Sequence, residues 1–248
     1  MALVNKFFYS CCREKELLAD TVVCISVEEM GYVSKSLRFD HLKALNLSNQ
    51  CLTEYTEDLS QLCQRLVELD LSNCEVSRGF LSDLLSEIAN GTKLRKLNLR
   101  SARIIINLSM DKPSLQYGEA LAKLEEANFW ASSVLDFNRI RDAFQTFQIM
   151  GSLGNLRILN LGNIDTLHWV EPGVFGKLLN KLEVLNIRNS MVTTPQFQCL
   201  VNEMEKGTNL KVLKMGDNRS FDYDIDHDYY DTNQLSVALN RVSEQYLH

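Results

Sequence analysis

The 248-residue sequence lacks the features that mark several large classes of protein. No apolar run approaches the 18 or so residues that a membrane-spanning helix needs, so the sequence predicts no membrane span. The formal net charge is −6, which offers no overall basic footprint of the kind that binds nucleic acid. We therefore expect neither a nucleic-acid ligand nor a membrane-spanning segment.

Motifs of the common enzyme classes are also missing. The four histidines, at positions 41, 168, 227 and 248, show no spacing typical of metal ligands. No glycine-rich phosphate loop follows a predicted strand, and no nucleophile motif is present. The sequence therefore predicts no enzymatic activity, with no catalytic residue, no metal site and no cofactor.

The cysteines argue against a disulfide-linked secreted fold. Seven is an odd number, and the seven cysteines follow no framework spacing. The first residues make a poor secretion signal, because Lys6 interrupts the apolar stretch too early. We expect reduced thiols and a cytoplasmic or nuclear location. Cys11 and Cys12 are candidates for acylation, although a buried pair is the simpler interpretation.

One short phrase, by contrast, recurs seven times along the chain. It reads Leu-x-x-Leu-x-Leu-x-x, then Cys, Asn or a small residue, then any residue and an apolar one. The copies begin at Leu42, Leu66, Leu94, Leu124, Leu156, Leu182 and Leu210, at intervals of 24, 28, 30, 32, 26 and 28 residues. A period near 28 residues with this phrase is typical of leucine-rich repeats.

The phrase predicts an α/β fold, a right-handed solenoid of about seven leucine-rich repeats. Alternation around positions 4 and 6 predicts a short strand whose apolar side faces the core, so successive strands form a parallel concave sheet. The connections have helical spacing and form the convex side. Helices are expected at residues 80–88, 113–123, 140–150 and 194–204, with Gly91 and Gly207 ending the first and last.

We divide the chain into an N-terminal helical cap (1–41), the repeat array (42–231) and a C-terminal helix (232–248). That helix either caps the array or leads into a further repeat. The fourth copy of the phrase is the weakest, because Ala127 and Phe129 replace its leucines. We accept it because the 62 residues from Leu94 to Leu156 are too long for one repeat.

Two positions of the phrase supply candidate binding residues on the concave face. Position 5 forms a polar ladder that includes Asn98, Asn128 and Asn160, which we interpret mainly as solvated strand positions. Position 7 places Arg100, Trp130 and Arg188 on the same face. Tryptophan and arginine are enriched at binding hot spots, so these three residues are the predicted centre of a protein-binding surface.

The alternative is that Trp130 folds against its own helix or a loop. If the ring is exposed, Arg100 can lie over it in a cation–π contact, and Gly162 leaves room between Trp130 and Arg188.

An unusual acidic segment lies at residues 221–231. Its alternating aspartates, Asp222, Asp224, Asp226 and Asp228, suggest calcium. A calcium loop of the EF-hand kind needs glycine at its sixth position and glutamate at its twelfth, where this chain has His227 and Asn233. We therefore interpret the segment as a solvated acidic loop that could contact a basic partner.

Two family resemblances extend this interpretation. Long helical crossovers and Cys74 at position 9 resemble the cysteine-containing, ribonuclease-inhibitor-like class of leucine-rich repeats, across residues 42–248. The runs 182–190 and 210–221 are similar to repeats of zyg-eleven-type substrate receptors of cullin ubiquitin ligases. In that family an N-terminal leucine and cysteine box docks an elongin adaptor; residues 17–24 have a similar composition but a different leucine-to-cysteine spacing.

The function expected from these patterns is that of an intracellular scaffold that binds a protein partner on its concave face. The second resemblance implies a substrate-recognition subunit of a ubiquitin ligase, with the ligase adaptor as one partner. The alternative is a stoichiometric inhibitor or regulator of an enzyme or a GTPase.

Overall fold

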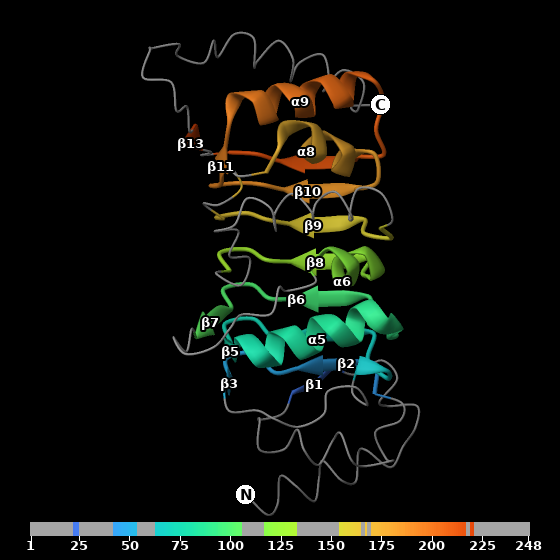
Figure 1. Ribbon diagram of the computed structural model, residues 1–248, viewed down its shortest axis with the longest axis vertical. Helices are drawn as coiled ribbons and strands as arrows, with labels where there is room; N and C mark the ends of the chain where they lie inside the picture. Colours follow the sequence, from blue (N-terminus) through green and yellow to red (C-terminus); the bar gives the residue numbers. More distant parts are fainter. Residues whose placement is uncertain are drawn as a thin grey trace, which may run out of the picture.

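A computed structural model describes residues 22–24, 42–53, 63–105, 117–132, 154–164, 167, 170–216 and 219–220. The described elements stack into an elongated body in which each repeat lies on the one before it (Figure 1). Within these ranges, no helix is both long and apolar enough to span a membrane.

An eight-stranded parallel sheet runs the length of the body in the order β1-β2-β4-β6-β8-β9-β10-β12. Its strands are β1 (Val22–Cys24), β2 (Ala44–Asn46), β4 (Glu68–Asp70), β6 (Lys96–Asn98), β8 (Glu126–Asn128), β9 (Ile158–Asn160), β10 (Val184–Asn186) and β12 (Val212–Lys214). From β2 onward each strand covers positions 3 to 5 of one repeat and pairs in register with the next. This sheet, with helices on one of its faces, is the predicted leucine-rich-repeat solenoid.

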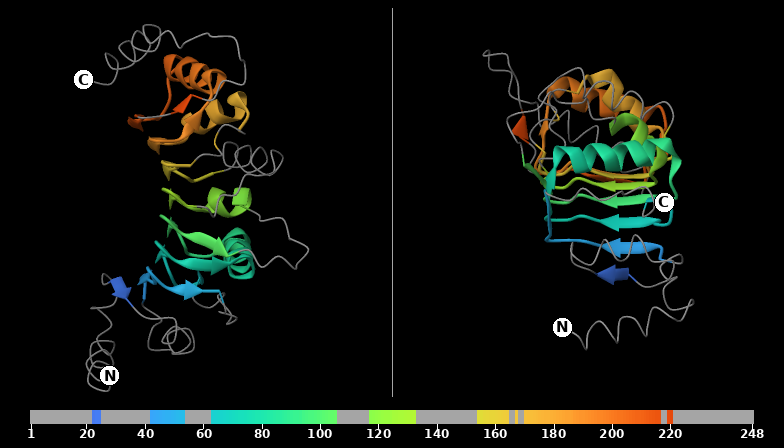
Figure 2. Two further views of the ribbon diagram at one scale, coloured as in Figure 1. Left: turned by 90° about the vertical axis from the view of Figure 1, so that its left-hand side faces the viewer. Right: turned by 60° about the horizontal axis from the view of Figure 1, so that its bottom comes forward.

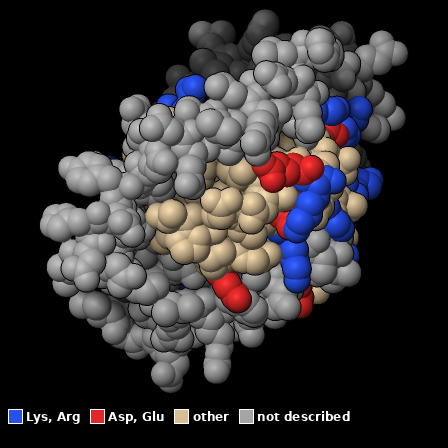
Figure 3. Space-filling view, turned by 90° about the horizontal axis from the view of Figure 1, so that it is seen from above, with Lys and Arg blue, Asp and Glu red and all other residues tan. Residues whose placement is uncertain are grey.

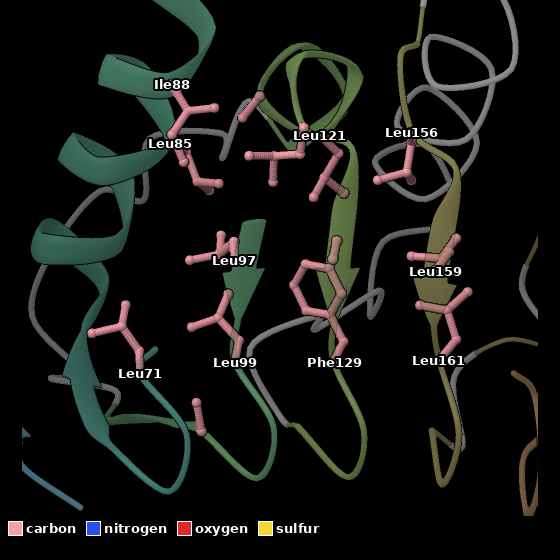
Figure 4. Packing of buried hydrophobic residues seen from close by; sticks show 14 of the residues in the cluster. Leu71, Leu85, Ile88, Leu97, Leu99, Leu121, Phe129, Leu156, Leu159 and Leu161 are labelled. Carbon is pink, nitrogen blue, oxygen red and sulfur yellow. The ribbon is translucent and has the colours of Figure 1, made fainter. Parts of the chain in front are cut away.

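The weak fourth repeat is genuine. Strand β8 lies between β6 and β9, and Ala127 pairs with Leu97 on one side and Leu159 on the other. Both Ala127 and Phe129 are completely buried. Figure 4 shows the Phe129 ring among the leucines of the neighbouring repeats. The larger ring occupies core space, as the leucines at the same position do in the other repeats.

Six strands of the large sheet, β2, β4, β6, β8, β9 and β10, are each followed by a tight turn at position 8 of the phrase. Six residues there adopt a left-handed conformation with φ between 52° and 62°: Asn49, Asn73, Ser101, Ala131, Asn163 and Asn189. Asparagine adopts this conformation more readily than most residues, which accounts for its repeated use. The turns lead into short parallel strands, namely β3 (Cys51–Leu52), β5 (Glu75–Ser77) and β7 (Arg103–Ile105) in one sheet and β11 (Met191–Val192) with β13 (Arg219–Ser220) in another.

The helices lie on one side of the large sheet and leave its other face open (Figure 2). They are α5 (Arg78–Gly91), α6 (Tyr117–Lys123), α8 (Pro172–Leu179) and α9 (Thr194–Glu205). The predicted helices 80–88 and 194–204 are confirmed, 113–123 is confirmed for its second half, and 140–150 lies outside the described residues. Helix α8 was not predicted. Gly91 and Gly207 have φ of 101° and 89°, as helix-ending glycines do.

The amino end of the sheet differs from the prediction. Residues 22–24 form strand β1, which pairs in parallel with β2, so a helical cap is wrong for these three residues. The sheet therefore begins one strand before the first copy of the phrase. The other residues of the predicted cap, the acidic segment 221–231 and the predicted helix 232–248 lie outside the described residues.

Candidate protein-binding surface

The open face of the large sheet is made by positions 3, 5 and 7 of each repeat. Positions 4 and 6 alternate with them and are buried beneath the helices from β2 to β10, with at most 4% of each residue exposed. Strand pairing therefore aligns the open-face residues in three rows across the sheet, and neighbouring strands are about 4.8 Å apart. All six residues predicted to bind a partner lie in the rows of positions 5 and 7.

The asparagines of position 5 are partly committed to the fold. The Oδ1 atoms of Asn98, Asn128 and Asn160 accept hydrogen bonds from the backbone N–H two residues later, at 3.1, 3.1 and 3.2 Å. Asp70 makes the same bond at 2.8 Å. A short polar side chain at this position therefore closes the end of its own strand. For the described part of the chain, the side-chain N–H₂ groups of these asparagines have no acceptor.

Trp130 is half-buried and lies across the next repeat. A Cβ atom added to Gly162 would be 2.2 Å from both Cε3 and Cζ3 of the indole, so the ring occupies the space that a side chain would take. The ring thus extends toward β9, on the side of β8 away from Arg100. The room predicted at Gly162 is real, and the indole itself fills it. Stacking of Arg100 on this ring stays a prediction.

The two arginines of position 7 are exposed. Arg188 extends toward the following repeat, since its Nε lies 4.0 Å from where a Cβ of Gly216 would be. Like Trp130, Arg188 therefore extends toward the glycine at position 7 of the next repeat, but at a contact distance. No carboxylate in the described ranges forms an ion pair with Arg100 or Arg188.

Other charges are paired between repeats. On the open face, Lys96 of position 3 pairs with Glu126 at 3.7 Å, and further pairs lie at the edge where the strands begin. Arg95 contacts Glu125 at 3.9 Å, and Glu183 bonds both Arg157 and Lys211, the latter at 2.9 Å. These five residues share position 2 of the phrase, and their signs alternate along the body. Seen from the C-terminal end, side chains of both signs gather on the side of the described surface where the strands begin (Figure 3).

The pairing at this edge changes the acidity of one carboxyl group. Hydrogen bonds from Lys211 and then Arg157 lower the pKa of Glu183 below its usual value. The stabilised form is the charged one, so the alternating row is held together at neutral pH.

The cysteines belong to the framework. The described ones, Cys24, Cys51, Cys63, Cys74 and Cys199, are all free thiols. Cys74 is buried, and its Sγ donates to the Leu47 carbonyl at 3.0 Å. Burial raises the pKa of the Cys74 thiol. Among the residues that the structure describes, no three His, Cys, Asp or Glu side chains gather in a way that could hold a metal ion.

The row at position 3 was missed by the sequence reasoning. It holds Ile158, Val184 and Val212 in the last three strands, and the outer two are 37% and 40% exposed. The signal was present, since aligning the seven copies of the phrase puts these residues in one column.

Comparison with solved structures finds similar folds. The chain is similar to an internalin (InlF) of Listeria monocytogenes, with a TM-score of 0.44, 17% identity, and coverage of 75% of this chain and 51% of that one. It is also similar to a leucine-rich-repeat protein of Leptospira interrogans, with a TM-score of 0.42, 18% identity, and coverage of 76% and 52%. The chain thus spans about half the length of these two structures.

A scan against protein-family models and a search of curated proteins each give no match. The assignment of the fold rests on the repeated phrase and on the register of the sheet.

Proposed function

We propose that the chain is a protein-interaction scaffold that binds a protein partner on the open face of its sheet. The observation that carries this proposal is a contrast between two sets of cations. Arg95, Arg157 and Lys211, at the edge, are paired with carboxylates of neighbouring repeats, whereas Arg100 and Arg188, on the open face, have no described carboxylate partner. Unpaired arginines beside a half-buried tryptophan are typical of binding hot spots.

Within this role, a substrate-recognition subunit of a cullin-type ubiquitin ligase in the cytoplasm or nucleus is the finer proposal. It is supported only by the likeness of residues 182–190 and 210–221 to zyg-eleven-type repeats. The alternative is a stoichiometric inhibitor or regulator of an enzyme or a GTPase. Affinity purification from cells separates the two: an elongin–cullin adaptor supports the ligase role, and a single enzyme or a small GTPase in equal amount supports the alternative.

The test of the general proposal is a paired measurement on Trp130→Ala. With the partner identified by that purification, the variant should bind about thirtyfold more weakly, because removing a hot spot costs about 2 kcal/mol or more. Thermal unfolding of the same variant shows whether the loss comes from the surface or from the fold. The exposed Gln198, on the helix side, provides the control variant Gln198→Ala, which should bind normally.

Normal binding by Trp130→Ala would remove this residue from the interface. Loss of binding that matches a loss of folded protein would make the indole purely structural.

A further inference from the structure

The open face changes its chemistry between β8 and β9. Position 3 is charged in β4, β6 and β8, where it holds Glu68, Lys96 and Glu126, and aliphatic in the next three strands. Strand register places Ile158 opposite Val184, and Val184 opposite Val212. Because neighbouring strands are about 4.8 Å apart, the three branched side chains form one continuous row. Strand propensity alone does not explain the row, because the three preceding strands do without aliphatic residues there.

This aliphatic row, made of Ile158, Val184 and Val212, is exposed at its two ends and half-buried at Val184. Within the described ranges, Ile158 and Val212 are the two exposed large hydrophobic residues. That both belong to the same row of the same face marks the row as a surface for apolar contact, since scattered exposed residues would not align.

Two cationic side chains lie on the open face beyond the aliphatic row, in the direction in which the strands run. Lys214 and Arg188 are two and four positions further along the phrase, which corresponds to about 7 and 13 Å in the strand direction. Both side chains are exposed, and neither has a carboxylate partner in the described part of the structure. Asn160 and Asn186 lie between the row and Arg188, with their Oδ1 atoms occupied by backbone N–H groups. Their N–H₂ groups point to no described acceptor.

We propose, on the premise of the scaffold function above, that this half of the open face binds an extended acidic segment of a partner protein. An aliphatic side chain of the segment packs on the aliphatic row, and carboxylates two and four residues away pair with Lys214 and Arg188. Same-face side chains of an extended chain recur about every 7 Å, which matches these separations. The chain as a whole is acidic, with a net charge of −6, but positions 3, 5 and 7 of its last three repeats carry Lys214 and Arg188 and no acidic residue, and this local positive charge favours an acidic partner.

The test uses the full chain and random 12-residue peptides displayed on phage. Recovered peptides, labelled with a fluorophore, are measured by anisotropy against wild type and variants. We expect Asp or Glu two or four residues from Leu, Ile or Val. Arg188→Glu should weaken binding at least tenfold, and Lys in place of the peptide carboxylate should restore part of the loss. Ile158→Thr combined with Val212→Thr should also weaken binding at least tenfold.

Arg103→Glu is the matched control. It makes the same change of charge at an exposed residue of β7, outside the large sheet, and should leave affinity unchanged. Urea unfolding of every variant checks that the folded state persists.

Several outcomes would overturn the inference. These are recovery of no peptide, recovery of basic or uncharged peptides, and binding that survives both the Arg188 and the aliphatic-row variants. If basic or uncharged peptides are recovered and Trp130→Ala weakens their binding, the open face binds protein but selects a different chemistry, and the scaffold proposal stands. If binding responds to no substitution on the open face, both proposals fail.

Discussion

The indole of Trp130 occupies the place of the side chain that Gly162 lacks. The two residues share position 7 in successive repeats, and a Cβ at 162 would be 2.2 Å from two carbons of the ring. Arg188 lies near Gly216 of the next repeat, but at 4.0 Å its Nε would only touch an added Cβ. The glycine is therefore required for the position of the large side chain at 162 and not at 216.

Gly162→Ala should consequently destabilise the fold by pushing the indole out of its position. Real Cβ contacts do not approach 2.2 Å, so ring or backbone must move, and overpacking of this kind costs about 1–3 kcal/mol. In a Trp130→Ala background the same change should cost less, and the cost that remains comes from the Arg188 carbonyl oxygen, 3.2 Å from the added Cβ. The free energy of unfolding of the two single variants and the double variant, from urea titration, gives the coupling between the residues.

Gly173→Ala is the control for this cycle. Gly173 lies in α8 with nothing within 4 Å of an added Cβ, so the change should be neutral or slightly stabilising. Equal costs of Gly162→Ala in both backgrounds would mean that the indole does not lie over Gly162.

Gln196 should contribute more to stability than its place at a helix start suggests. The N-cap of α9 is Thr193, whose Oγ1 accepts from the Gln196 N–H, while Gln196 Oε1 accepts from the Thr193 N–H at 2.9 Å. The Gln196 Nε2 also donates to the buried carbonyls of Leu167, at 2.8 Å, and Val170. One side chain thus caps α9 and satisfies two carbonyls of the preceding repeat.

We expect Gln196→Ala to lower the free energy of unfolding by about 2–3 kcal/mol, because buried acceptors lose their donor. Thr193→Ala should cost about 1 kcal/mol, as an ordinary cap does. The exposed Gln198, on the same helix, supplies the comparison, and Gln198→Ala should change stability little. If Gln196→Ala costs no more than Thr193→Ala, the bonds to the preceding repeat contribute nothing.

The strands were predictable because a fixed phrase specifies them one at a time. Alternating core leucines recur at a nearly constant spacing, so even Ala127 and Phe129 were placed correctly from the repeats on either side. Strand β1 carries no copy of the phrase, and its pairing with β2 is a tertiary contact that local pattern does not encode. Helix α8 was missed because it has only eight residues, two of which are glycines with low helix propensity, so local pattern favours it weakly.

The candidate surface was predictable in position but not in detail. Alternation places Arg100, Trp130 and Arg188 on the open face, and the structure agrees. That Trp130 leans over Gly162, and that Arg100 and Arg188 have no described carboxylate partner while Lys96 on the same face pairs with Glu126, depends on side-chain directions and distances between repeats. Those follow only once the strands are set side by side.

The charge row at the strand starts predicts a pH dependence of stability. The pKa of Glu183 is lowered in the folded state by Lys211 and Arg157, so its charged form stabilises the fold. That contribution is fully present above the pKa of the unfolded chain, near 4.3, and is lost as the pH falls through the lower folded value. Glu183→Gln should therefore be less stable than wild type at pH 7, and the difference should shrink below about pH 4.

Urea unfolding at pH 7 and pH 3 checks this expectation. Because the pair is at the surface, salt should also reduce the difference. Glu205→Gln, at an exposed carboxylate without a described ion pair, is the control and should show neither dependence. A wild-type advantage that stays constant between the two pH values would contradict the role of the Glu183 charge.

Substitutions of Asn160 should distinguish its role in closing the end of β9 from its role in binding. Its Oδ1 accepts from the Gly162 N–H at 3.2 Å, and Asp70 makes the equivalent bond in the second repeat. Asn160→Asp should keep the acceptor and nearly all the stability, whereas Asn160→Ala should cost about 1 kcal/mol. The aspartate should at the same time weaken binding of acidic peptides by repulsion. An aspartate variant as unstable as the alanine variant would show that the N–H₂ group, and not Oδ1, stabilises the turn.

The cysteines should be reduced throughout. Thiol titration of freshly purified protein under denaturing, non-reducing conditions should find seven free thiols, and five or fewer would contradict this. In the native protein Cys51, which is exposed, should react quickly with a thiol reagent. Cys63 and Cys74 are buried and should react only on unfolding. For Cys74 the raised pKa adds to this protection, since the thiolate is the reactive form.

Cys74→Ser should be well tolerated for a reason that the repeat itself supplies. Ser190 occupies the same position 9 and donates its hydroxyl to the Leu161 carbonyl at 2.8 Å, as Cys74 donates to Leu47. The serine variant keeps a donor for that carbonyl, so we expect a loss of about 1 kcal/mol or less in urea unfolding, and a larger loss for Cys74→Ala, which leaves the carbonyl without it. If alanine proves milder than serine, Cys74 acts only as a small apolar residue and its hydrogen bond is incidental.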